Sequence, residues 1–195
     1  MPAPTGHRIA TPTRLRTFLV SLILLLATTL RDEAATLTWT GGGASDDTNL
    51  IGNWGFIPAT GDLLHFAGTT RLTPNQVNAL SIGSLTFDSG AGAFSLGGNT
   101  YTITGASGVT NNSTNTQTIN NAITLGLAQT WSATSGNLVF GGNIATGGFV
   151  LTITGGSNTS ASGNISGTGG LTKTGAGTLT LSGVNTYTGK TTIQG

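Results

Sequence analysis

The last 27 residues of the chain, from Gly169 to Gly195, constrain its fold more than any other stretch. Apolar residues alternate there with Thr and Ser, as in residues 178–182 (TLTLS), and Gly interrupts the runs every few residues. Such alternation places Leu179 and Leu181 on one face of a strand and the Thr side chains on the other. Short strands that recur between Gly turns, without a helical period, predict a β-solenoid in which one coil stacks on the next.

Composition supports an ordered all-β chain. The 195 residues include 32 Gly but only 7 Lys and Arg and 6 Asp and Glu, far below the usual quarter of charged residues. Disorder normally requires high charge and few apolar residues, whereas Leu, Ile, Val and Phe recur regularly here. From Thr36 onward 3 cations and 4 anions give a charge of −1. The absence of a basic stripe argues against nucleic-acid binding.

The N-terminus has the pattern of a secretory signal. Arg14 and Arg16 precede an uncharged, mostly apolar run over residues 17–30. A membrane-spanning helix needs about 20 such residues, so the run predicts a helical signal segment over residues 1–35 that engages the export machinery. We expect cleavage near Ala34 or Ala35, with an uncleaved anchor as the alternative. The absence of cysteine excludes disulfides and Cys-based metal sites.

The remaining chain divides into two segments. Residues 36–79 combine aromatic side chains with turn sequences and predict an N-terminal cap that covers the first coil; the aromatic residues are Trp39, Trp54, Phe56 and Phe66. Residues 80–195 predict the solenoid itself, with its clearest repeat at 169–195. We therefore expect an all-β fold, a parallel β-helix or β-solenoid with an N-terminal cap, preceded by the helical signal segment.

An imperfect internal repeat supports coils of roughly 20 residues. The triplet Gly-Gly-Asn begins at Gly97 and again at Gly141, 44 residues later, and each copy precedes a strand that ends in Thr-Ile-Thr-Gly. Gly is expected at tight corners because it adopts positive φ without penalty. Corner Asn residues tolerate the left-handed region and hydrogen-bond to neighbouring backbone; they are Asn99, Asn143 and Asn185.

The C-terminal stretch resembles the autotransporter-associated beta strand repeat. The matching residues are Gly170, Leu171, Lys173, Gly175, Gly177, Leu179, Leu181, Gly183, Asn185, Tyr187, Gly189 and Thr191. The resemblance implies a passenger-type parallel β-helix at the cell surface, secreted or associated with the outer membrane. The sequence stops just after one clear repeat, as expected of a fragment, a truncated gene or a short relative.

No constellation of residues predicts catalysis, cofactor binding or metal binding. Asp46 and Asp47 with Asn49 lack the spacing of a known calcium loop. His65 is the one histidine after the signal segment, and a Ser–His–Asp arrangement with Asp62 has no nucleophile elbow to support it. We therefore expect no catalytic residue, no cofactor and no metal.

The resulting hypothesis is a non-enzymatic, exported or cell-surface β-solenoid that serves as a stalk, spacer or adhesin. Its expected partners are surface glycans or a second copy bound through the C-terminal edge. One alternative is a glycan-active β-helix enzyme that uses Asp62 or Asp88, because a glycosidase needs two carboxylates within about 5–10 Å. Another is a glycan-binding module that uses an exposed Trp54 or Trp131.

Overall fold

The computed structural model describes Met1 and residues 33–194. Residues 2–32 of the expected signal segment lie outside the described residues, so its helix stays a prediction. Among the described residues, no helix has the length and apolar character needed to cross a membrane. The solenoid belongs to the compact unit that begins at Ala34.

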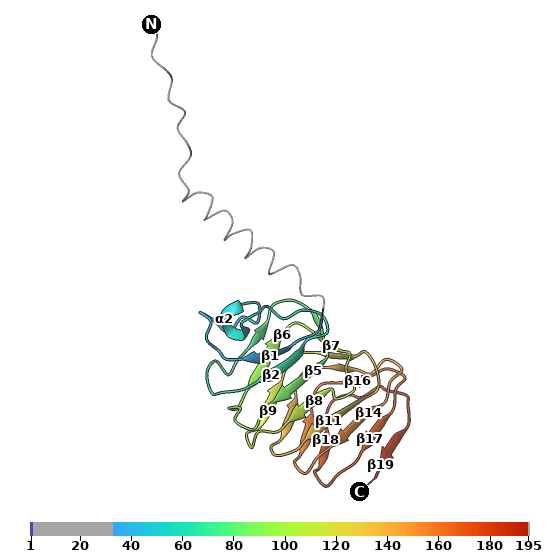
Figure 1. The fold of residues 1–195 in the computed structure, drawn as a ribbon. Helices are drawn as coiled ribbons and strands as arrows, with labels where there is room; N and C mark the ends of the chain where they lie inside the picture. The colour runs from blue at the N-terminus through green and yellow to red at the C-terminus, as the bar shows by residue number, and fades with distance from the viewer. Residues whose placement is uncertain (2–32, 195) are drawn as a thin grey trace. The chain divides into compact units, whose positions relative to one another are not determined.

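Three parallel sheets build this unit (Figure 1). The first sheet has eight strands, which are β1 (Thr36–Trp39), β2 (Leu63–Phe66), β5 (Ser84–Phe87), β8 (Val109–Asn111), β11 (Gln129–Ala133), β14 (Leu151–Thr154), β17 (Leu171–Lys173) and β19 (Thr191–Ile193). The second has six, which are β3 (Asn75–Gln76), β6 (Ser95–Gly98), β9 (Gln117–Ile119), β12 (Leu138–Phe140), β15 (Thr159–Ala161) and β18 (Leu179–Leu181). The third has five, which are β4 (Leu80–Ile82), β7 (Tyr101–Ile103), β10 (Ile123–Leu125), β13 (Ile144–Ala145) and β16 (Ile165–Ser166).

From β2 to β18 the chain visits the three sheets in turn, and each strand pairs in parallel with the strand one coil away. Antiparallel hairpins, the arrangement that would have contradicted the expected solenoid, do not occur among the strand pairs of the described residues. The all-β parallel β-solenoid expected from the sequence is therefore confirmed.

Coil length becomes constant toward the C-terminus. Thr36 registers with Leu63, 27 positions later, whereas Gln129 registers with Leu151, 22 positions later. In the last two coils the paired residues are 20 positions apart, from Leu151 to Leu171 and from there to Thr191. The final coils therefore share one cross-section.

The two Gly-Gly-Asn copies lie two coils apart, as their spacing indicates. Gly97 follows Leu96 and Gly141 follows Phe140. Both Leu96 and Phe140 register with Ile119, one coil from each. The 44-residue repeat therefore corresponds to two successive coils.

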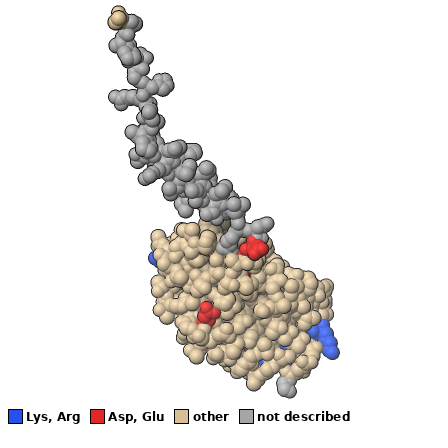
Figure 2. Space-filling model, in the orientation of Figure 1, with Lys and Arg blue, Asp and Glu red and all other residues tan. Residues whose placement is uncertain are grey.

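Alternation along each strand separates a buried inner face from a polar outer face. In β14, Leu151 and Ile153 are buried while Thr152 and Thr154 lie on the outer side. The same pattern recurs from coil to coil, so the inner side chains form one continuous core. Burial of apolar area at about 25 cal/mol per Å² is the main stabilising contribution. Few charged side chains interrupt the tan surface in Figure 2.

The core is not purely apolar, because it also contains buried polar side chains. Asn111 is buried at the end of β8, where its amide donates to the carbonyls of Asn115 and Asn137. The Tyr101 hydroxyl donates to the side-chain oxygen of Gln76, and burial raises the pKa of the Tyr101 phenol. These polar groups are tolerated inside because each has a hydrogen-bond partner.

Asparagine ladders join successive coils at the corners. A side-chain oxygen in one coil accepts a backbone N–H from the next, at 2.8–3.0 Å, in the pairs Asn137 with Asn158, Asn158 with Thr178, Asn143 with Asn164, and Asn164 with Val184. The expected corner hydrogen bonds are confirmed. The left-handed backbone that Asn tolerates is not used, since Arg71 is the only non-Gly residue with positive φ among the described residues.

The N-terminal segment combines strands with one helical turn. Strands β1 and β2 already belong to the first sheet, although they lie within the segment expected to form a cap. The helix α2 (Ile51–Trp54) was not expected, because one turn is too short to show a helical period. Gly55 ends it with φ of 81°, the left-handed conformation that favours Gly after a helix.

Candidate functional site

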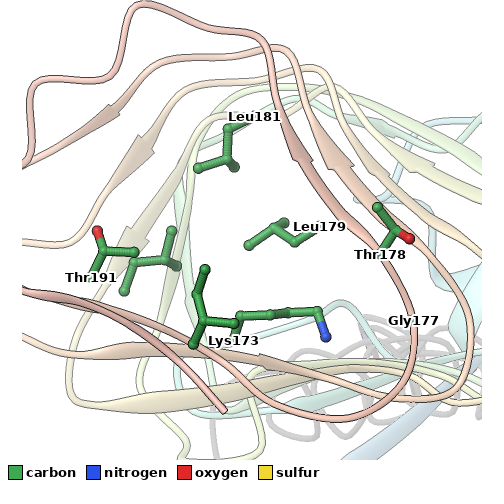
Figure 3. A pocket seen from close by; sticks show the side chains of 8 residues that line it. Lys173, Gly177, Thr178, Leu179, Leu181 and Thr191 are labelled. Atoms are coloured by element: carbon green, nitrogen blue, oxygen red, sulfur yellow. The ribbon is translucent and has the colours of Figure 1, made fainter. Parts of the chain in front are cut away.

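A hollow lies at the C-terminal end of the solenoid. It has a volume of about 360 Å³, and its lining residues are Leu171, Lys173, Gly177, Thr178, Leu179, Leu181, Thr191 and Ile193. Figure 3 shows Leu179 and Leu181 projecting inward from β18, across from Lys173. We call this hollow the end groove.

The end groove exists because no described coil covers the last one. One coil earlier, Leu151 and Ile153 are buried beneath the following coil. In the last coil the same inward alternation leaves Leu179 and Leu181 only half-buried. Ile193 is 80% exposed, although its register places it above the core. The groove is therefore the uncovered interior of the solenoid.

Lys173 occupies a position that is apolar in the neighbouring coils. It registers with Ile153 on one side and with Ile193 on the other. Its Nζ donates to the carbonyls of Thr174 and Gly175 at 2.7 and 2.8 Å. The side chain therefore lays its hydrocarbon stem along the groove while its charge turns to polar groups. The alternation Leu171-Thr172-Lys173 contains the signal for this inward position, although the sequence alone did not lead us to it.

The groove is bounded by two edge strands. β18 pairs with β15 and β19 pairs with β17. The Lys190 carbonyl accepts from the Leu171 N–H, and the Gln194 N–H donates to the Lys173 carbonyl. Because backbone groups alternate in direction along a strand, the N–H and C=O groups of Thr191 and Ile193 point away from β17. Among the described residues, no strand pairs with these groups.

The N-terminal end of the solenoid is closed by comparison. Trp39 of β1 is fully buried, and its ring lies 5.1 Å from that of Trp54 in α2. Trp54 is 5% exposed and donates its indole N–H to the Thr48 carbonyl. The Phe66 ring completes the cluster, 5.3 Å from Trp54. Trp39, Trp54 and Phe66 thus cover the inner face of the first coil, whereas Phe56, which was also expected in the cap, is 53% exposed.

The structure does not bring the two candidate catalytic carboxylates together. Asp62 precedes β2, and Asp88 follows β5, which pairs in register with β2. Four strand residues therefore separate them along the sheet, a distance of about 15 Å at the rise of an extended chain. This exceeds the separation that a glycosidase acid and base need.

Each of these carboxylates has a local structural partner. The buried Asp62 carboxylate accepts the backbone N–H groups of Ala35 and Ala59 at 2.9 and 2.7 Å. Asp88 lies 2.9 Å from His65 Nδ1 on the outer side of the first sheet. The structure therefore pairs His65 with Asp88, not with Asp62, and an outward His65 agrees with the alternation of β2.

The expectation that Trp54 or Trp131 is exposed for glycan stacking is wrong. Trp131 is fully buried, and its ring stacks on that of Phe140 with centroids 4.5 Å apart. Trp54 closes the N-terminal end. Both side chains serve the core because each lies where an inward apolar position must be filled.

The acidic turn after β1 is occupied by local hydrogen bonds. Asp47 accepts the Asn49 backbone N–H at 2.7 Å, which is an Asx turn. Asp46 accepts from the Thr73 hydroxyl and lies 3.4 Å from Arg71. These contacts join the segment before α2 to the chain that enters β3, so the carboxylates have a structural role.

A comparison with protein families identifies the coil that forms the end groove. Residues 171–195 match the family model described as passenger-associated-transport-repeat. The last coil is therefore similar to that repeat. The resemblance stated from the sequence is thereby confirmed for this stretch. All eight residues that line the end groove lie within the matched residues. Comparisons with curated proteins and with solved structures give no match.

The repeat and the solenoid together fit an autotransporter passenger domain. They point to a structural or surface role, and the repeat implies a secreted or cell-surface location. The matched stretch covers one 20-residue coil and the strand β19 that follows it, because Leu171 and Thr191 occupy the same register position.

Proposed function

We propose that the chain is an exported, non-enzymatic passenger solenoid that acts as a spacer at the cell surface. The observation that supports this role is the unbroken parallel pairing from β1 to β19 in the first sheet. Each coil adds one strand spacing, about 4.8 Å, to the length of the column. The length of the column therefore increases by the same amount with every added coil, which is the property that a stalk requires.

The outer surface is consistent with a passive spacer. In the described residues, Thr and Ser occupy most outward positions of the later coils, as Thr152 and Thr172 do in the first sheet. No Asp or Glu occurs from Ser89 to the end of the sequence. A neutral polar surface is well solvated without attracting ions or nucleic acid. An adhesive role toward surface glycans is the alternative, and polysaccharide binding distinguishes it from the spacer role.

Duplication of two coils tests the spacer role. We expect that a second copy of residues 129–170, inserted after Gly170, lengthens the column by about 10 Å, because strands stack about 4.8 Å apart. The insert preserves the register, since Leu151 to Leu171 and Gln129 to Leu151 already define two consecutive coils. Spin labels on Thr86→Cys and Thr172→Cys report the distance, and the chain has no native Cys to interfere.

The same labels on the parent chain are the control for the duplication. An unchanged label distance, or loss of β structure in circular dichroism, would contradict the spacer role. If the parent chain binds purified surface polysaccharides, and if the duplication does not change this binding, an adhesin is favoured instead.

Export is tested separately through the apolar run of residues 17–30. We expect a tagged full chain, expressed in a Gram-negative host, to reach the periplasm or the medium with its N-terminus shortened. Leu24→Arg combined with Leu25→Arg interrupts the run that a signal segment needs, so this variant should stay in the cytoplasm at full length. Mass spectrometry of each fraction measures both outcomes. A parent chain confined to the cytoplasm would contradict export.

A further inference from the structure

The outer face of the first sheet carries hydroxyl side chains in two regular columns. One column crosses β11, β14 and β17, which lie side by side (Figure 1), and consists of Thr130, Thr152 and Thr172. The other crosses β8, β11 and β14 and consists of Thr110, Ser132 and Thr154. All six side chains are exposed or half-buried, and we call them the hydroxyl array. Each of the four strands is paired on both sides, so the array is separate from the end groove.

The array has two fixed repeats. Neighbouring strands lie about 4.8 Å apart, and residues two positions apart along a parallel strand are separated by about 6.6 Å. Thr130 and Ser132 share β11, and Thr152 and Thr154 share β14, so the longer repeat separates the columns. A β-branched side chain has few rotamers, which fixes the hydroxyl and the methyl group of each Thr. The array is therefore a small rectangular lattice of hydroxyl groups.

The hydroxyl groups of the array are available to an external ligand. Ser132 shares a hydrogen bond with the Thr134 hydroxyl at 3.0 Å, and the other five have no side-chain hydrogen bond to any described residue. Hydroxyls elsewhere behave differently, since those of Thr104 and Thr146 donate to carbonyls of a neighbouring coil. The fold thus leaves the donors and acceptors of the array unused.

The two-column pattern is specific to this face. On the second and third sheets, Val139 and Ala145 interrupt the corresponding columns. The charged contact of His65 with Asp88 lies nearer the N-terminal end of the first sheet, on β2 and just after β5. The array itself is neutral. Its spacing, and not its charge, therefore selects a ligand.

A neutral lattice of hydroxyl and methyl groups fits a ligand that is itself a neutral hydrogen-bonded lattice. The prism face of hexagonal ice presents oxygen atoms in a rectangular lattice whose two repeats are close to those of the array. We propose that the hydroxyl array binds ice. Liquid water hydrogen-bonds to any exposed hydroxyl, whereas an ordered lattice engages all six groups at once. Because the parallel sheet holds these groups in place beforehand, binding costs little conformational entropy.

Crystalline polysaccharide is the other neutral lattice with hydroxyl groups, and this face suits it less well. Sugar rings are usually held by stacking on exposed aromatic side chains. Trp131 is the one aromatic residue in β8, β11, β14 and β17, and it is fully buried. The face therefore offers hydrogen bonds at fixed spacings without a surface on which a sugar ring stacks.

The shaping of ice crystals by the full chain tests the proposal. We expect the full chain at millimolar concentration to hold the freezing point of a small ice crystal below its melting point, and to give the crystal flat prism faces. Thr152→Tyr places a ring at the centre of the array, on a strand that accepts aromatic residues. This ring keeps the sheet away from the ice, so the gap between the two temperatures should fall at least fivefold.

Thr124→Tyr is the matched control. Thr124 is the half-buried outward residue of β10 in the third sheet, and it registers with Thr102 and Ala145 in the neighbouring coils. The same substitution in the same kind of position should leave the temperature gap within twofold of the parent value. An equal loss in both variants would overturn the assignment of ice binding to the first sheet.

A second array variant separates lost binding from misfolding. Thr130 is exposed on β11, so Thr130→Tyr should keep the fold and also reduce the gap at least fivefold. Circular dichroism compares each variant with the parent chain. A parent chain that neither shapes ice nor enters slowly growing ice overturns the proposal. It is also overturned if the parent chain binds crystalline cellulose or chitin, loses this binding in Thr152→Tyr, and leaves ice unshaped.

Discussion

Replacement of Trp131 by alanine is expected to lower the free energy of unfolding by about 3–5 kcal/mol. The side chain is fully buried in β11, near the middle of the column. Its ring stacks on Phe140, and its indole N–H donates to the Gln129 side chain at 2.8 Å. Trp131→Ala removes the ring contacts, leaves a cavity and leaves the buried Gln129 side-chain oxygen without its hydrogen-bond donor. Each of these three effects lowers the free energy of unfolding.

Equilibrium unfolding in urea measures this loss, with Thr130→Ala as the control. Thr130 is the preceding residue of β11 and is exposed on its outer face, so its truncation should change stability by less than about 0.5 kcal/mol. Because coils contact only their neighbours, a defect in a middle coil also uncouples the two halves. We therefore expect the Trp131→Ala transition to broaden. Equal effects of the two variants would contradict the buried position of the ring.

The second large effect is expected for Gly169→Ala, at the corner before β17. A Cβ added to Gly169 would overlap the carbonyl group of Phe149 in the coil below. The Gly169 N–H also donates to the Gly147 carbonyl at 2.9 Å. The two backbones are thus held too close for any side chain, and forced overpacking costs about 1–3 kcal/mol or more.

Gly97→Ala is the control, with an effect of opposite sign. Gly97 lies in β6, and a Cβ added there meets no atom within 4 Å. Substitution at such a site removes freedom from the unfolded chain and should stabilise the fold by about 0.4–1 kcal/mol. Thermal unfolding of the two variants separates close coil approach from glycine flexibility. A stabilising Gly169→Ala would show that the corner can widen.

The strands that were predictable are those with large inward side chains. In β14, β17 and β18, Leu and Ile alternate with Thr, and these strands form where the alternation places them. Other strands have no such pattern: β15 buries only Thr159 and Ala161, and β8 ends on the buried Asn111. Their place in the sheets comes from the coils on either side, which a single strand's own pattern does not contain.

The end groove was foreseen only as an open sheet edge. The inward side chains of Leu179 and Leu181 are predictable, because these residues alternate with Thr. The inward direction of Lys173 follows from the same alternation, but its position next to Ile153 depends on the register between coils. The burial of Trp131 depends likewise on where the neighbouring coil places Phe140. Contacts between coils decide these positions, and a sequence without a known register does not supply them.

The scarcity of ion pairs has a consequence for where such a fold can work. Among the described residues the charged contacts are His65 with Asp88 and Arg71 with Asp46, and both lie in the first half of the column. The later coils are held together by asparagine side-chain hydrogen bonds and by apolar packing. Neither dissolved salt nor moderate acidity weakens these interactions directly. We therefore expect the stability of the later coils to change little between fresh water and brine, so that they do not depend on a regulated ionic environment.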